Sequence, residues 1–385
     1  MNAAGDWLDH PGTQGLMQAL EAAGHRALLV GGCVRNALLR EPVSDIDLAT
    51  DATPQTVSDL AEAAGFKVVP TGIDHGTVTV IAQGKPHEVT TFRRDVQTDG
   101  RRAVVAYSTD IAEDARRRDF TMNALYADRH GTVIDPLGGL PDLQARRVRF
   151  VGDPETRIRE DYLRILRFFR FHAAYGDPDG GIDPEGLSAC AALAEGLDGI
   201  SRERIHAELR KLLSARDPAP AVAAMSKAGV LARVLPGADP RALAPLVHLE
   251  SGHLDADHPP RWLRRLAVLG GDTSDLRLSR AEARDLAAVH AAIGSTDTPA
   301  ALGWRLGEDL ATDAILARAA SLGTQPPPDW QAEARRGATA RFPVTAADLM
   351  PGLQGEVLGA RLKALEARWL ASDLTLSREA LLKGA

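Results

Sequence analysis

The chain has few of the residues that build disulfide-rich, metal-clustered or membrane-spanning proteins. Its 385 residues include only two cysteines, Cys33 and Cys190, too few for a disulfide framework or a zinc cluster. Aromatic residues make up 4% of the sequence, which argues against an aromatic stacking surface for nucleic acid. No stretch reaches the roughly 18 apolar residues of a membrane span, and the N-terminus has no secretory pattern. We therefore expect a cytoplasmic protein with no membrane association and no disulfide-linked partner.

An excess of charge of one sign is also lacking. The net charge is −7 with 25% charged residues, so any RNA contact must come from local basic patches. At about 150 residues per domain, the length suggests two or three domains. The hydrophobic fraction of 44% is sufficient for their cores.

Two short segments near the N-terminus carry the strongest chemical signal. An apolar run ending in Gly31-Gly32, with Arg35 close behind, predicts a strand and a tight turn whose amides can approach a triphosphate. Asp45 and Asp47 lie in a second strand pattern, where residues two apart share a face. Neighbouring carboxylates repel unless a cation lies between them, so the pair favours a metal site. A solvated surface pair is the alternative.

The familiar nucleotide and calcium motifs do not fit these segments. Ala49 and Thr50 occupy the positions where an EF-hand needs an oxygen ligand and a glycine. Gly84-Lys85 runs into Pro86, which excludes a Walker loop, and no third glycine follows Gly31-Gly32 to make a Rossmann fingerprint.

The first half of the chain mixes strands and helices. The polar residues 93–110 predict a mobile loop, and Arg116-Arg117-Arg118 is either a solvated face or a triphosphate clamp. The other predicted elements are helices at 13–23 and 54–65, a strand at 26–30, and a hairpin of strands at 77–81 and 87–92 with its turn at 83–86.

From about residue 153 the pattern becomes helical. A long helix is predicted at 155–174, with Asp161, Arg164, Arg167 and Arg170 at three-residue steps. Such a row can be a ladder of ion pairs, but the excess of arginine over acid favours an anionic ligand. The remainder, 179–385, is predicted to be helical and to bind a macromolecule.

Six motifs, in one order over residues 28–175, resemble those of the class II tRNA nucleotidyltransferases, the bacterial CCA-adding enzymes and related poly(A) polymerases. A weaker likeness extends to Asp348-Leu349-Met350 and 362–377. The six motifs are Gly31-Gly32-Cys33-Val34-Arg35, Asp45-Ile46-Asp47-Leu48-Ala49-Thr50, His75-Gly76-Thr77-Val78, Glu88-Val89-Thr90-Thr91-Phe92-Arg93, Arg117-Arg118-Asp119-Phe120-Thr121-Met122-Asn123-Ala124 and Arg159-Glu160-Asp161-Tyr162-Leu163-Arg164-Ile165-Leu166-Arg167.

The resemblance implies an α+β fold, with a polymerase-beta-like head built on a mixed, mostly antiparallel sheet, followed by all-α parts. It implies a catalytic head at 1–150 and a neck at 151–215 that carries a nucleotide-templating helix. A helical body at 216–305 and a tRNA-binding tail at 306–385 would follow.

The implied reaction is addition of C, C and A to the 3′ end of tRNA, with ATP and CTP as substrates and Mg²⁺ as cofactor. Asp45 and Asp47 would bind the metal ions, with Glu88 as third catalytic carboxylate; Glu88 could instead be an ion-pair partner of Arg93 or Arg94. The nucleotide-binding residues implied are Gly31, Gly32, Arg35, Arg118, Asp161, Arg164, Arg167 and Arg170, among which Asp161 and Arg164 resemble the family's template for C and A.

One departure from the family pattern is Asn36, where an aspartate usually follows Arg35. We expect activity to persist because asparagine keeps an acceptor oxygen at that position. A poly(A) polymerase or an enzyme adding only CC or only A remains an alternative, and so does a noncatalytic RNA-binding protein. Buried Asp45, Asp47 and Arg164 would be costly without a ligand, which argues against the last.

Overall fold

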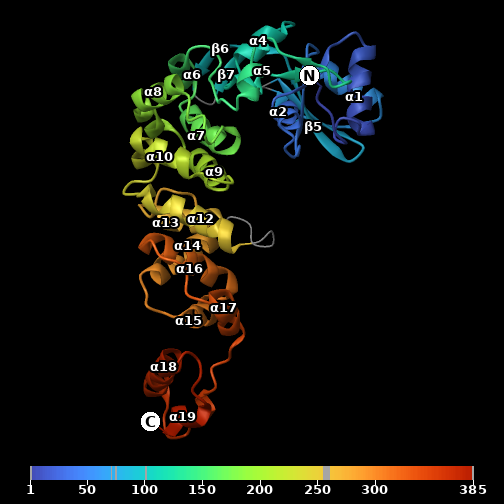
Figure 1. Ribbon diagram of the computed structural model, residues 1–385. Coiled ribbons are helices and arrows are strands. Elements are labelled where there is room, and N and C mark those ends of the chain that lie inside the picture. The colour runs from blue at the N-terminus through green and yellow to red at the C-terminus, as the bar shows by residue number, and fades with distance from the viewer. Residues whose placement is uncertain (1, 71, 74–75, 100–101, 255–260, 384–385) are drawn as a thin grey trace. The chain divides into compact units, whose positions relative to one another are not determined.

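The computed structural model of the chain describes residues 2–70, 72–73, 76–99, 102–254 and 261–383 (Figure 1). The chain forms two compact units. The first contains Met1–Glu208 and Ala224–Val234, and the second contains Leu209–Ala223 and Leu235–Ala385.

A seven-stranded sheet forms the centre of the first unit, in the order β3-β4-β5-β2-β1-β8-β9. Every neighbouring pair is antiparallel except β2 and β5, which are parallel. The predicted mixed, mostly antiparallel sheet is therefore confirmed. Its strands are β1 (Ala27–Val30), β2 (Ile46–Thr50), β3 (Lys67–Val69), β4 (Thr77–Ala82), β5 (Lys85–Thr91), β8 (Tyr126–Ala127) and β9 (Val133–Ile134), and a separate two-stranded sheet pairs β6 (Arg93–Asp99) with β7 (Arg102–Tyr107).

The other regular elements of the described chain are helices, and no strand follows β9 in it, in agreement with the predicted α+β class. The helices are α1 (Pro11–Ala22), α2 (Gly32–Leu39), α3 (Pro54–Ala63), α4 (Ile111–Arg116), α5 (Leu140–Gln144), α6 (Pro154–Glu160), α7 (Leu163–Tyr175), α8 (Pro184–Ala192), α9 (Arg202–Leu213), α10 (Ala219–Lys227), α11 (Val230–Val234), α12 (Leu243–His253), α13 (Trp262–Leu269), α14 (Arg280–Ile293), α15 (Pro299–Leu306), α16 (Glu308–Leu322), α17 (Trp330–Thr339), α18 (Gly355–Ala371) and α19 (Arg378–Lys383).

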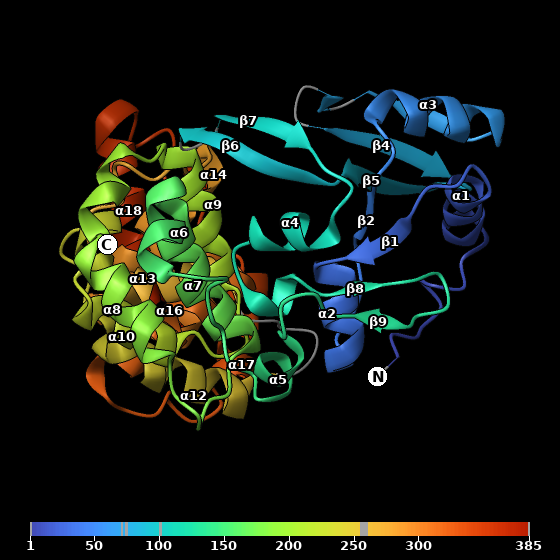
Figure 2. The ribbon, with the colours of Figure 1, turned by 90° about the horizontal axis from the view of Figure 1, so that it is seen from above.

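Helices α1 and α3 cover one face of the sheet, whereas the opposite face carries polar side chains on β2 and β5 and, nearer β1, apolar side chains that pack against α4. Helices α1 and α3 pack against each other and against the sheet (Figure 2). Thr13 of α1 hydrogen-bonds the buried His87 of β5 at 2.9 Å. Because successive strand residues point to opposite faces, Glu88 points away from α1. The exposed Glu88 therefore lies on the face that α1 leaves open.

Most of the few phenylalanines gather where α7 meets the segment after α4. Phe120 lies 5.0 Å from Phe150 and 4.9 Å from Phe171 between ring centroids, and Phe150 stacks on Phe168 at 5.4 Å. Burying three or four such rings contributes several kcal/mol, on the scale of about 1.5–3 kcal/mol for each fully buried phenylalanine. This cluster packs α7 against the segment after α4 within the first unit.

Most local predictions are confirmed, two are wrong, and one helix was not predicted. The predicted loop at 93–110 contains the paired strands β6 and β7. The prediction failed because a two-stranded ribbon can be polar on both faces, so a polar sequence does not exclude strands. The predicted helix at 155–174 breaks at Asp161, which has extended φ and ψ of −157° and 104° and whose carboxylate accepts from the Leu163 amide. Helix α2, which follows Gly31 directly, was not predicted from the sequence.

The second unit has a buried network of charges among its helices. Arg264 pairs with Glu250 at 3.0 Å and with Asp313 at 2.8 Å, while Arg265 pairs with Glu250 at 2.8 Å. All four side chains are at most 4% exposed. Each charge is neutralised locally, as burial requires.

A search of the described residues finds no helix long and apolar enough to cross a membrane.

Candidate active site

Three carboxylates meet where the parallel strands β2 and β5 pair. Asp45 immediately precedes β2, Asp47 lies within it, and the β2–β5 register places Asp47 directly beside Glu88. All three line a cavity of about 320 Å³ together with Ser44, Ile46, Thr79 and Pro86. Glu88 therefore lies on the strand next to Asp47, as a third carboxylate of the site requires. The alternation that turns Ile46 and Leu48 into the core leaves Asp47 at the cavity.

The electrostatics of Asp47 show that this group of carboxylates lacks a neutralising charge. Burial and the neighbouring Glu88 and Asp45 carboxylates together raise the pKa of Asp47 to about 6, against the opposing effect of Arg118. A divalent cation would relieve this repulsion, and carboxylate oxygens are the ligands that Mg²⁺ prefers.

The same carboxylates provide only part of a complete metal site. Among the described residues, no group of three or more His, Cys, Asp or Glu is placed to hold a metal ion by itself. Magnesium usually binds through one or two carboxylates and takes its remaining ligands from water and substrate phosphates. The residues present therefore fit a magnesium ion that binds together with a nucleotide.

A second cavity, of about 200 Å³, lies on the other side of the aspartate pair. Asp45 and Asp47 line it together with Gly32 and Arg35 of α2 and with Tyr175 at the end of α7. The aspartates thus lie between a cavity on the β5 side and a cavity formed by α2 and α7.

The Gly31-Gly32 turn requires glycine for a local reason. Gly31 has φ of 72°, and a Cβ there would lie 3.2 Å from Nη1 of Arg118. Because Gly31 has no side chain, Arg118 can lie close to the backbone at the N-cap of α2. Backbone amides at the start of a helix favour anions, and Arg118 adds a positive charge at the same place.

Arg118 is fixed by buried partners and is not part of a solvated arginine face. It pairs with Asp114 at 3.2 Å and donates to the Tyr126 hydroxyl, while Arg117 pairs with Asp114 at 2.7 Å. Burial alone would raise the pKa of Asp114, but Arg118 and Arg117 more than offset it and lower the pKa. The aspartate therefore stays ionised and holds both arginines.

Arg35 is equally constrained. Its guanidinium donates to Oδ1 of Asn36 at 2.8 and 3.1 Å, to Oδ1 of Asn123 at 2.5 Å and to the Tyr175 hydroxyl at 2.8 Å. The expectation that Asn36 supplies an acceptor oxygen to Arg35 is confirmed. The Asn36 amide nitrogen also donates to the Pro42 carbonyl at 2.7 Å, a bond that an ionised aspartate could not make.

The predicted row of four side chains on one helix is not observed. Asp161 lies outside α7 and pairs with Arg204 of α9 at 2.6 Å. Arg164 donates through Nη1 to Glu160 at 2.5 Å and to the Arg157 carbonyl at 2.6 Å.

The other two arginines of the row also have protein partners. Arg167 pairs with Asp119 at 2.5 Å, and Arg170 pairs with Glu208 at 2.6 Å. The premise that these arginines lack enough acidic partners is therefore wrong. Their partners come from segments distant in sequence, so the spacing within the helix could not reveal them.

Asp119 is the residue that sequence reasoning passed over. Its Oδ2 accepts from Arg167 and its Oδ1 accepts from the Asn123 amide at 3.0 Å, and Asn123 in turn holds Arg35. Burial alone would raise the pKa of Asp119, but Arg167 and Asn123 offset it and hold the pKa at about 2. Its place directly after Arg117-Arg118 in a family-like motif was the available signal.

Two family models match parts of this chain. A family model described as the poly A polymerase head domain matches residues 27–149, and one described as the "probable RNA and SrmB-binding site of polymerase A" matches residues 181–241. The human "CCA tRNA nucleotidyltransferase 1, mitochondrial" is 44% identical over 203 residues, 52% of this chain and 47% of the relative. The CCA-adding enzyme of Leuconostoc citreum is 40% identical over 226 residues, 58% of this chain and 54% of the relative. The matched region spans about half the length of these curated relatives.

Solved structures extend the likeness to nearly the whole chain. The Bacillus stearothermophilus CCA-adding enzyme in complex with CTP matches with a TM-score of 0.72 and 30% identity, over 94% of this chain and 93% of that chain. The Thermotoga maritima CCA-adding enzyme complexed with tRNA_CCA matches with a TM-score of 0.68 over 100% of this chain and 98% of that chain. At 18% identity, the latter match supports the fold alone.

Proposed function

The chain belongs to the class II tRNA nucleotidyltransferases, the family of CCA-adding enzymes and bacterial poly(A) polymerases, and we propose that it adds C, C and A to the 3′ end of tRNA from CTP and ATP. The observation that carries this proposal is the pairing of Asp47 with Glu88 beside Asp45, next to the positively charged turn of Gly31, Gly32 and Arg118. This arrangement provides carboxylates for a metal and donors for a triphosphate within one site.

The reaction needs one bond formed and one broken. The 3′-hydroxyl oxygen of the RNA attacks the α-phosphorus of the nucleotide, and the bond to the leaving diphosphate breaks as the hydroxyl proton is lost. Asp45 and Asp47 would hold two Mg²⁺ ions, with Glu88 as the third carboxylate. When bound, such ions lower the pKa of the attacking hydroxyl and neutralise the leaving diphosphate.

Three groups of the head are proposed to bind the phosphates and sugar of the nucleotide. The Gly32 amide approaches the phosphates, Gly31 forms the turn while its own amide donates to the Leu125 carbonyl at 3.1 Å, and Arg118 adds a guanidinium fixed by Asp114. Arg35, held from three sides, contributes a pre-oriented donor near the sugar. Because these side chains are already immobilised, little ordering is needed when the nucleotide binds.

Asp161 and Arg164 are proposed to select the base. Cytosine and adenine each present an exocyclic amine beside a ring-nitrogen acceptor, which a carboxylate and a guanidinium can pair. Uracil and guanine present the opposite order, so a donor would face a donor. Arg164 uses Nη1 within the protein, and no hydrogen bond from its other nitrogens is found in the described chain. Arg167 and Arg170 complete the pocket.

The helical remainder would position the RNA. We propose a head at 1–150, a neck at 151–215, a body at 216–305 and a tRNA-binding tail at 306–385. The match of residues 181–241 to an RNA-binding model supports the RNA contact. A cytoplasmic location is part of the proposal, and the two free, buried cysteines are compatible with a reducing compartment.

A poly(A) polymerase is the second candidate, because the matching head model carries that name. Both activities need the same carboxylates and phosphate-binding groups, so the head does not distinguish them. An enzyme adding only CC or only A would share this head as well.

Incorporation of labelled CTP and ATP, separately and together, into a tRNA transcript ending at the discriminator base tests the proposal. Addition of CCA alone would establish it, and long A tails, on the tRNA or on an unstructured RNA, would identify a poly(A) polymerase. Asp45→Asn should be inactive, and Asp59→Asn on the exposed part of α3 is the matched control. Failure of the unaltered protein to add any nucleotide with Mg²⁺ present would contradict the proposal.

A further inference from the structure

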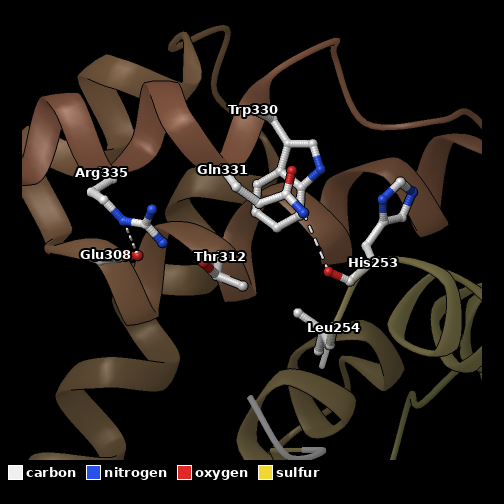
Figure 3. A pocket seen from close by; sticks show the side chains of 7 residues that line it. All are labelled: His253, Leu254, Glu308, Thr312, Trp330, Gln331 and Arg335. Atoms are coloured by element: carbon white, nitrogen blue, oxygen red, sulfur yellow. Dashed lines mark hydrogen bonds and ion pairs between the residues drawn. The ribbon is translucent and has the colours of Figure 1, made fainter. Parts of the chain in front are cut away.

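A small cavity in the second unit, remote in sequence from the catalytic carboxylates, contains a buried donor that has no partner within the described ranges of the chain. The cavity has a volume of about 170 Å³ and is lined by His253, Leu254, Glu308, Thr312, Trp330, Gln331 and Arg335 (Figure 3). These residues come from the end of α12, the first half of α16 and the first half of α17.

Trp330 provides the main observation. Its side chain belongs to the hydrophobic core of this unit and the residue is only 2% exposed, yet its indole N–H has no hydrogen-bond partner among the residues that the structure describes. Buried donors without an acceptor are rare in folded proteins because their desolvation is not compensated. The indole nitrogen is on the side of the ring that faces His253, whose ring centroid lies 6.1 Å away (Figure 3).

The start of α17 adds further donors at the same place. Trp330 is the first residue of this ten-residue helix, and its N-cap Asp329, with φ of 54°, makes no side-chain capping bond. The amides of an uncapped first turn and the helix dipole both favour an anion. Two independent features, the indole and the helix terminus, therefore point to an acceptor with negative charge.

The remaining charges of the cavity are compatible with an anion. Glu308 is neutralised by Arg335, whose Nε lies 3.0 Å from the carboxylate. No hydrogen bond from the two terminal nitrogens of Arg335 is found in the described part of the chain. A volume of about 170 Å³ is below the range of about 300–1,000 Å³ for sites of drug-sized ligands, which favours one small group over a whole nucleotide.

We propose that this cavity binds a single phosphate group, through the Trp330 indole, the first amides of α17 and Arg335. The phosphate can come from free inorganic phosphate or from the backbone of a bound RNA. Only the RNA source rests on the function proposed above.

Indole N–H signals in proton–nitrogen correlation spectra of the full chain provide a direct test. The protein has five tryptophans, and Trp330→Phe assigns the signal of interest. Addition of inorganic phosphate at constant ionic strength should shift the Trp330 signal in a saturable manner. Trp369→Phe is the matched control, because Trp369 is 3% exposed and belongs to a different core cluster.

Loss of one buried bond to a charged group should weaken phosphate binding by about tenfold or more in Trp330→Phe. Arg335→Gln, a change on an exposed side chain, should weaken phosphate binding without disturbing the core.

A tRNA transcript is then titrated by fluorescence anisotropy without nucleotide or Mg²⁺. Weaker RNA binding by Trp330→Phe than by Trp369→Phe identifies an RNA phosphate, and unchanged RNA binding combined with a phosphate response identifies free phosphate. Absence of any Trp330 response to phosphate or to RNA would overturn the proposal.

This result does not depend on catalysis. A protein that adds CCA without any Trp330 response would refute only the phosphate site, whereas a Trp330 response in a protein that adds no nucleotide would refute only the proposed function.

Discussion

The Asp119 carboxylate binds Arg167 directly and Arg35 through Asn123. Removing this carboxylate should remove a pH-dependent part of the unfolding free energy of the first unit. Asp119 is held at a pKa of about 2, compared with 3.8 for an ordinary aspartate, because its ion pair with Arg167 and its bond from Asn123 outweigh the effect of burial. A depression of nearly two units corresponds to about 2 kcal/mol of unfolding free energy.

The direction of the pH dependence follows from the lower pKa in the folded state. The full contribution is present above about pH 4 and is lost as the pH falls through about 2. At pH 3 about 1 kcal/mol of it should already be gone. Asp119→Asn keeps the shape of the side chain but cannot ionise. The stability difference between unaltered and variant protein should therefore shrink by about 1 kcal/mol between pH 7 and pH 3.

Urea-dependent hydrogen exchange, read by mass spectrometry on peptides from residues 119–175, measures this difference in the first unit alone. Asp59→Asn, on the exposed side of α3, reports any general effect of losing one carboxylate. A stability difference for Asp119→Asn that is the same at pH 7 and pH 3 would refute the assignment of Asp119 as an aspartate kept ionised by Arg167.

Three further predictions concern the site and its surroundings. Asp47→Asn should lower nucleotide addition on the order of 10³-fold while tRNA binding without nucleotide is unchanged, since the carboxylate is proposed to bind the metal. Primer extension measures nucleotide addition, and fluorescence anisotropy measures tRNA binding. Arg164→Ala should lower discrimination against UTP and GTP by about 10²-fold or more in the same extension assay, because a base-pairing donor is lost. Burial raises the pKa of Cys33 to about 11, so about 0.1% of the thiol is ionised at pH 8 and a disulfide reagent should modify it only after unfolding.

Each of these has a clear opposing result. Retained activity in Asp47→Asn would remove it from the metal site, and retained selectivity in Arg164→Ala would show that another residue chooses the base. Rapid modification of Cys33 in the native protein at pH 8 would contradict its burial beneath the turn at Gly31-Gly32.

The local patterns in the sequence were sufficient for several elements and for the candidate site residues. Proline after a capping threonine marked α3, and alternation of apolar residues marked the β4–β5 hairpin. The Asp45-Ile46-Asp47 alternation was enough to predict a shared face. In each case the interactions that decide the structure lie within a few residues along the chain.

Tertiary structure decided which partners the charged residues have. The parallel register of β2 and β5 brings Glu88 to Asp47 across 41 positions of sequence (88 − 47), and no local pattern encodes that register. Asp119, Arg204 and Glu208 meet the arginines around α7 only because the phenylalanine cluster and α9 pack there. A short-range signal can indicate that an arginine is present on a helix, whereas the energy of burying its charge depends on which carboxylate the fold brings beside it.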